Sequence, residues 1–388
     1  MRAFTGTIPL DAWYSPTIEA QLERILESAV SSGVTPGAAV VVGDGDGVVE
    51  AAVGALRYAT AGDHTPPPPT GVHSLYDVAS LTKPMATSAC AMVLAADGAL
   101  ELDEPAAPHL PELCAEGGGR ITFRHLLGHA SGLPAHVPFY RRLWAGERAG
   151  ASSPREALLR MAGSTALEAE PGSRVAYSDL GFILLAFAIE RLAGEPLDRL
   201  ANRLIFKPLA MTRTRYVDLA DLDRPALVAP TELCGVRGLV RGEVHDENAH
   251  AAGGICGHAG LFSTAADVAA FARALCRAAA GARDLPFAPE IVRAFFRERG
   301  GPGSTWRLGF DTPSPEPGLS SAGDRWPARG VGHLGFTGTS MWLDPETCHY
   351  VVLLTNRVHP TRERQGIREL RRAIMDAAAA AMGYSPRR

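Results

Sequence analysis

The arrangement of strand-like and helix-like segments along the chain constrains its fold most strongly. Residues 36–54 contain two apolar runs separated by a Gly/Asp-rich turn, which predicts a β-hairpin near the N-terminus. Near the C-terminus, residues 339–345 and 349–356 have the composition of strands, and a turn containing Pro345 separates them. A helical centre lies between these two regions. We therefore expect one sheet that is built from both ends of the chain.

Helical patterns account for much of the remaining sequence. Residues 16–32 place apolar side chains at helical spacing, and residues 80–96 form an apolar, alanine-rich stretch that is typical of a buried helix. Thr264, followed by Asp267, has the pattern of a helix cap. A closing helix is expected over residues 363–382.

These elements predict the fold class α/β (α+β), with an antiparallel sheet flanked by helices and a second part that is mostly helical. We expect a single domain over residues 16–385. Its sheet lobe would come from about 16–75 and 300–385, and its helical lobe from about 76–299. A cleft between the two lobes is the expected place for a functional site.

Composition excludes several classes of function. The chain has 388 residues, 46% of them hydrophobic and 21% charged, which is ordinary for a soluble globular protein. A formal net charge of -4 gives no footprint for nucleic acid or for an anionic membrane. No apolar run approaches the length of a membrane span, and residues 1–16 contain no apolar signal region. These features predict a cytoplasmic protein.

The six cysteines are scattered along the chain without a C-x-x-C pair. In a reducing compartment such cysteines are expected to be free thiols, several of them in apolar surroundings. They are Cys90, Cys114, Cys234, Cys256, Cys276 and Cys348.

The strongest chemical signal is the tetrapeptide that begins at Ser80 and ends at Lys83. Lys83 is one of only two lysines in the chain, the other being Lys207, and every other basic side chain is an arginine. A lysine amine can be deprotonated if its pKa is lowered, whereas a guanidinium cannot. On a helix the i, i+3 spacing places both side chains on one face. The pattern predicts a serine nucleophile with a lysine base.

Two residues from a second segment could complete this chemistry. Tyr177 offers a phenol that can relay a proton to a leaving group or activate water. Asp179, two residues later, could hold Lys83 by a charge-assisted hydrogen bond.

A third, glycine-rich segment near the C-terminus would lie along the substrate. His333 would give electrostatic or hydrogen-bonding help, and Gly335 would let the substrate approach the strand closely. The backbone N–H groups of Phe336 and Ser80 are the expected oxyanion donors. The register of this segment stays open, because residues 336–338 could take the place of residues 333–335.

Taken in order, these segments resemble the S-x-x-K, Y-x-N and K-T-G or H-x-G motifs of the serine β-lactamase and penicillin-binding protein superfamily. The resemblance extends from about residue 16 to 380 and is nearest to the class C-like esterases and D-alanyl-D-alanine peptidases. It implies a β-lactamase/transpeptidase-like fold and a covalent acyl-serine intermediate. The matching segments are Ser80-Leu81-Thr82-Lys83, Tyr177-Ser178-Asp179 and His333-Leu334-Gly335.

Two departures from these motifs bear on the reaction. Asp179 stands where asparagine is usual, and its negative charge would tend to raise the pKa of Lys83. His333 and Leu334 replace the lysine cation and threonine hydroxyl with which the family holds the carboxylate of a β-lactam. These changes favour an esterase or amidase over a β-lactamase.

Other polar residues could edge the pocket. Residues 244–250 contain two carboxylates and two histidines, and His258 follows. A metal site is one interpretation, but adjacent Asp and Glu side chains diverge, so we predict no metal and a role for His245 in substrate binding. Arg357 either lines the cleft and binds a substrate carboxylate or lies on a surface loop.

The sequence thus predicts a serine hydrolase that acts through an acyl-Ser80 intermediate on a small ester or amide, most simply as a carboxylesterase. Action on peptidoglycan fragments as an amidase or D-Ala peptidase is the alternative, with weak β-lactamase activity beside it. A non-catalytic binding protein on the same fold is a third interpretation. No cofactor, nucleic acid or membrane span is expected, and the oligomeric state stays undetermined.

Overall fold

The computed structural model describes residues 16–61, 64–217, 227–301, 303–316 and 318–387. The first 15 residues, which carry most of the expectation about a targeting segment, lie outside this range. Among the described helices, none is long and apolar enough to cross a membrane.

The two ends of the chain form one five-stranded antiparallel sheet, as predicted. Its strand order is β2-β1-β10-β9-β8, and the N-terminal strand β1 pairs directly with the C-terminal strand β10. Ala38 lies opposite Thr355, and Val42 lies opposite Val351. The strands are β1 (Gly37–Gly43), β2 (Val48–Gly54), β8 (Val331–Leu334), β9 (Ser340–Asp344) and β10 (His349–Thr355).

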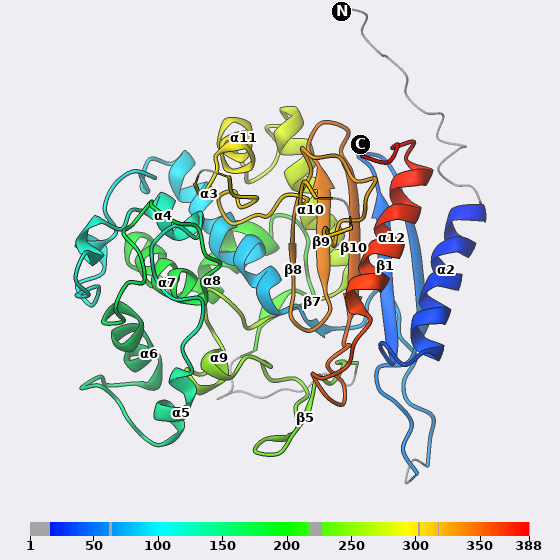
Figure 1. Cartoon of the computed structure of the whole chain (residues 1–388), viewed down its shortest axis with the longest axis horizontal. Helices are drawn as coiled ribbons and strands as arrows, with labels where there is room; N and C mark the ends of the chain where they lie inside the picture. Colours follow the sequence, from blue (N-terminus) through cyan, green and yellow to red (C-terminus); the bar gives the residue numbers. More distant parts are fainter. Residues whose placement is uncertain (1–15, 62–63, 218–226, 302, 317, 388) are drawn as a thin grey trace, which may run out of the picture.

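Helices cover both faces of this sheet, because the side chains of β1 alternate between two apolar cores. Val40 and Val42 pack in one core with α2 (Pro16–Ser31) and α12 (Ile367–Ala381), which lie side by side in Figure 1. Ala39 and Val41 face the other core, and α10 (Ala265–Ala280) packs there. The structure thus places α10 on the sheet, although its residues were expected in the helical lobe.

The second part of the molecule is mostly helical and surrounds α7, whose side chains are buried along most of its length. It lies beside the sheet in Figure 1. Its helices are α3 (Ala89–Ala96), α4 (Phe123–Leu127), α5 (Phe139–Trp144), α6 (Pro154–Gly163), α7 (Asp179–Ala193), α8 (Leu197–Ala201), α9 (Glu247–Ala251) and α11 (Pro289–Arg297). Shorter helical turns are η1 (Ala79–Leu81), η2 (Lys83–Ser88), η3 (Ala107–His109), η4 (Gly118–Arg120) and η5 (Asn202–Phe206).

Two small sheets also occur in this part, which the sequence did not predict. One has the strand order β3-β7-β4, and the other is the hairpin of β5 and β6. Their strands are β3 (Tyr76–Asp77), β4 (Arg215–Tyr216), β5 (Leu233–Cys234), β6 (Gly238–Leu239) and β7 (Leu261–Ser263).

Local signals placed most helix boundaries well. The Thr264 side chain accepts a hydrogen bond from the Asp267 N–H at 3.2 Å, which confirms the predicted cap of α10. The closing helix begins at Ile367 and not at residue 363. Gly366, with φ of 94°, adopts a left-handed conformation that a helix cannot continue through.

Candidate active site

Ser80 lies on a strained turn at the edge of a cavity. Ala79, which precedes it, has φ of 49°, a conformation that costs free energy in any residue with a Cβ. The buried Asp77 carboxylate stabilises this turn by accepting the Ala79 N–H at 2.8 Å. Both Ala79 and Ser80 line a cavity of about 530 Å³ between the sheet and the helical part.

Lys83 lies one helical turn after Ser80 and is fully buried. Its Nζ donates to three oxygens: Ser80 Oγ at 3.2 Å, Asp179 Oδ1 at 2.7 Å and the His258 carbonyl at 3.1 Å. An ammonium has three N–H donors, so these acceptors satisfy all of them. The geometry brings together Ser80, Lys83 and Asp179, which the sequence predicted to be neighbours.

The charge of Lys83 is set by its surroundings. Burial alone would disfavour the ammonium, but the Asp179 carboxylate outweighs it and raises the pKa of Lys83 above its ordinary value. Burial would conversely favour protonated Asp179, yet Lys83 and His136 hold the pKa of Asp179 well below its usual range. The resting site therefore holds an ammonium–carboxylate pair at neutral pH, as the aspartate in the second motif suggested.

Tyr177 completes the cluster. Lys83 Nζ lies 4.7 Å from the centre of its ring, and both Lys83 and Ser80 are close enough to the Tyr177 hydroxyl to influence its pKa. Burial raises the pKa of Tyr177, so the phenol is protonated at neutral pH. His129 and Trp306 pack against the ring and fix its orientation.

His333, on β8, is a neutral histidine. Its Nδ1 lies 2.8 Å from the Leu334 carbonyl, which can only accept, so Nδ1 carries the hydrogen and Nε2 is left as an acceptor. Burial, with the nearby Lys83 cation, lowers the pKa of His333 to about 3. The side chain therefore cannot replace the cation that the family's lysine supplies, and hydrogen-bonding help is the role that its chemistry allows.

The backbone that follows β8 packs tightly against the segment before Ser80. A Cβ on Gly335 would lie 2.6 Å from the Val78 carbonyl, so only glycine fits there. Thr337 and Thr339 donate their hydroxyls to the Asp77 and Val78 carbonyls at 2.8 and 3.0 Å. These contacts fix the turn that precedes Ser80.

The cavity lining supports the first of the two registers considered for the third motif. His333, Leu334, Gly335 and Phe336 line the cavity, whereas Thr337 is bonded to Asp77. Within the described chain, the N–H groups of Phe336 and Ser80 have no backbone acceptor, so both are available as hydrogen-bond donors.

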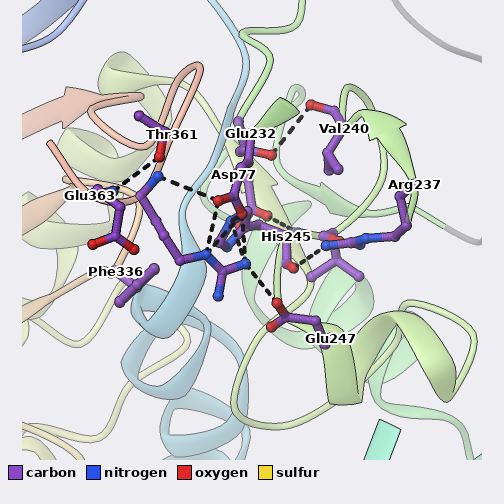
Figure 2. A network of polar contacts seen from close by, with 12 residues as sticks. Asp77, Glu232, Arg237, Val240, His245, Glu247, Phe336, Thr361 and Glu363 are labelled. Carbon is purple, nitrogen blue, oxygen red and sulfur yellow. Dashed lines mark hydrogen bonds and ion pairs between the residues drawn. The ribbon is translucent and has the colours of Figure 1, made fainter. Parts of the chain in front are cut away.

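A polar network borders the mouth of the cavity. Arg362 donates to Glu232 and Glu247, and His245 pairs with Glu232 at 2.9 Å. Figure 2 shows Glu232, His245 and Glu247 gathered in this network with the Phe336 ring beside them. The ring is 51% exposed and stacks on His245 at 5.7 Å between centroids. This confirms that the 244–250 segment edges the cavity.

Arg357 lines the cavity, and its binding of a substrate carboxylate stays a prediction. His359, two residues later, stacks on Tyr58 and is not part of the lining. Across the described ranges, no group of three or more His, Cys, Asp or Glu side chains could hold a metal ion.

Sequence reasoning missed several lining residues that come from loops or from the far end of the chain. They are His136, Trp306, Asp311, Arg362 and Arg371. For Arg371 a signal was available. It stands three and four residues before Ile374 and Met375, on the buried face of α12, where an arginine is unexpected.

Comparison with known proteins now places this site in a family. The Beta-lactamase family model matches residues 22–376, almost the whole chain. The chain belongs to the β-lactamase family. Membership accounts for the β-lactamase/transpeptidase-like fold and for the order of the three motifs, and it supports a hydrolase.

Similar curated proteins are named as a carboxypeptidase and an amidase. A putative D-alanyl-D-alanine carboxypeptidase of Escherichia coli K12 is 31% identical over 379 residues, covering 92% of this chain and 86% of the relative. N-acetylmuramyl-L-alanine amidase of Bacillus subtilis is 28% identical and covers 87% and 81%.

Solved structures show the same fold. EstCE1, a hydrolase with promiscuous acyltransferase activity, matches with a TM-score of 0.69 and 23% identity over 94% of this chain and 98% of its own. Simvastatin synthase (LovD) from Aspergillus terreus matches with a TM-score of 0.72 and 21% identity over the same shares.

Proposed function

We propose that this β-lactamase-family protein is a serine hydrolase that forms a covalent acyl ester on Ser80. One observation carries the proposal: Ser80 Oγ lies 3.2 Å from Lys83 Nζ, at the edge of a cavity that Tyr177 also lines. A serine hydroxyl needs a base at hydrogen-bonding distance to become a nucleophile.

In the proposed reaction the Lys83 ammonium first releases one proton to solvent. The neutral amine then takes the proton of Ser80, while Oγ attacks the substrate carbonyl carbon. The carbonyl electron pair moves onto oxygen, where the Ser80 and Phe336 N–H groups stabilise it. When the pair returns, the bond to the leaving group breaks, and the Tyr177 phenol supplies the proton that this group needs. Water then attacks the acyl carbon and gives one proton to the Tyr177 phenolate. As the acid product leaves, Lys83 returns its proton to Ser80 Oγ.

Asp179 controls the first of these steps. Because its carboxylate raises the pKa of Lys83, replacement by the neutral isostere asparagine should lower that pKa. Lys83 works as a base only when neutral, so the acidic limb of the pH profile of kcat/KM should move toward lower pH in Asp179→Asn. Steady-state hydrolysis from pH 6 to 11 measures the shift. An unmoved limb, equal to that of the exposed Asp97→Asn control, would refute this role.

The substrate is proposed to be an ester, as for a carboxylesterase, with amides of cell-wall fragments as a second candidate. The cavity lining favours a negatively charged substrate, because Arg357 lines it and forms no ion pair with a carboxylate among the described residues. The names of the E. coli and B. subtilis relatives, a carboxypeptidase and an amidase, support the amide candidate.

Arg357 is proposed to bind a substrate carboxylate. Among the described residues its guanidinium donates only to the carbonyls of Phe336, Arg362 and Arg364, so its charge is available to a ligand. Arg357→Gln should raise KM about 10-fold for substrates with a free carboxylate, the worth of one charged hydrogen bond. KM for a neutral ester is the internal control and should not change. Equal changes for both substrates would contradict carboxylate binding.

A direct test is to mix the protein with a p-nitrophenyl ester, follow release of nitrophenol and weigh the protein by mass spectrometry. A burst and an acyl adduct on Ser80 are expected. Absence of both the burst and the adduct would overturn the proposed enzymatic activity and favour a non-catalytic binding protein. Parallel assays with esters, β-lactams and muropeptide-like amides would then rank the substrate classes.

A further inference from the structure

A buried arginine without an acidic partner lies beneath the third motif. Arg371, on α12, is only 8% exposed, and within the described residues it forms no ion pair. Its Nη2 donates to the carbonyls of Gly335 at 2.7 Å and Thr339 at 2.8 Å, and its buried Nε has no acceptor. Burial, with the nearby Arg357 cation, lowers the pKa of the guanidinium. Burying an unpaired charge is costly, so its place needs a reason.

The Gly335 carbonyl belongs to the same peptide group as the Phe336 N–H. That carbonyl accepts two hydrogen bonds, one from the Arg371 guanidinium and one from the Gly338 N–H at 3.0 Å. Donors at a carbonyl oxygen draw electrons from the amide nitrogen, and the N–H at the other end becomes a stronger donor. Such coupling strengthens a bond by about 10–30% per neighbour, and charge increases the effect.

We propose that Arg371 is a positioning residue that strengthens the oxyanion hole by polarising the Gly335–Phe336 peptide group. The cation acts on the backbone and not on the substrate. A carboxylate partner would weaken its field at the peptide, and among the described residues Arg371 has no such partner. This inference rests on the proposed function, since it takes the Phe336 N–H as an oxyanion donor.

Two other roles for Arg371 predict different results. If Arg371 bound a substrate carboxylate, its loss would affect only substrates that carry one. If it served only to hold the turn, its loss would change stability and KM. Polarisation predicts a lower acylation rate even for a neutral ester, with KM little changed.

The test compares Arg371→Gln and Arg371→Lys with Arg368→Gln, an exposed arginine on the same helix. With a neutral p-nitrophenyl ester, Arg371→Gln should acylate about 10-fold more slowly, a smaller loss than removal of a whole oxyanion donor. Arg371→Lys keeps the charge and should stay within about threefold of the wild type. A small loss is expected because an ammonium has fewer N–H donors than a guanidinium. Arg368→Gln should not change.

An infrared measurement isolates the polarisation from the shape of the turn. In an isotope-labelled acyl-enzyme, the acyl carbonyl stretch falls as the oxyanion donors become stronger. Arg371→Gln should shift this band to higher wavenumber, with a smaller shift for Arg371→Lys. If thermal melting shows that Arg371→Gln does not fold, Arg371→Met, which is uncharged and of similar length, carries the test with the same expected loss of rate.

An unchanged rate together with an unshifted band in the folded variants would overturn the proposal and leave the proposed function intact. A loss confined to carboxylate-bearing substrates would also overturn it, in favour of direct carboxylate binding. If the wild-type protein formed no acyl adduct at all, the proposed function itself would fail, so the two failures are distinguishable.

Discussion

Replacement of Ser80 by alanine should abolish acyl transfer. When a nucleophilic serine and its base act together, loss of the serine lowers kcat by about 10⁴-fold or more, because the base then has no nucleophile to activate. The value of kcat/KM for a p-nitrophenyl ester should fall accordingly, and mass spectrometry should detect no acyl adduct.

The same variant should fold normally, since Ser80 is only partly buried and the Ala79 turn is held by Asp77 through the backbone. A thermal melt equal to that of the wild type is the control. A Ser80→Ala protein that still forms an adduct would place the nucleophile elsewhere and refute the assignment.

Replacement of Lys83 by arginine should have an effect nearly as large. Arginine keeps the positive charge beside Asp179 but cannot be deprotonated, so it preserves the ion pair and removes the base. General-base catalysis contributes about 10²–10⁴-fold, and acylation should slow by that factor. A stopped-flow measurement of the burst rate checks the prediction.

The chain provides its own control for this variant. Lys207 is the only other lysine and lies outside the cavity, so Lys207→Arg should leave the burst rate unchanged. If Lys83→Arg reacted at close to the wild-type rate, Lys83 would not be the base.

Local sequence patterns were enough to predict most of the fold. The strands of the terminal sheet, the cap of α10 and the helix after Ser80 were all predicted, because alternation, helical spacing and capping residues act over a few neighbours. The short strands β3 to β7 were missed. They have two or three residues each, and β3, β4 and β7 are defined only by pairing with distant segments.

The candidate site divides in the same way. The i, i+3 spacing alone places Lys83 near Ser80, and the motif order brought Tyr177 and His333 to the same cleft. His136 and Trp306 were missed because each stands in a loop with no pattern around it, and only the folded chain brings them to the cavity.

By itself, the sequence determined which groups can react: one serine, one lysine that can be deprotonated, and one phenol in the order of a known family. Only the tertiary structure decided their charge states. Asp179 keeps Lys83 as an ammonium, and burial keeps His333 neutral. Arg371 forms no ion pair with a carboxylate among the described residues. The physical reason is that a pKa depends on burial and on charges within a few ångströms. Those neighbours come from segments that only folding brings together.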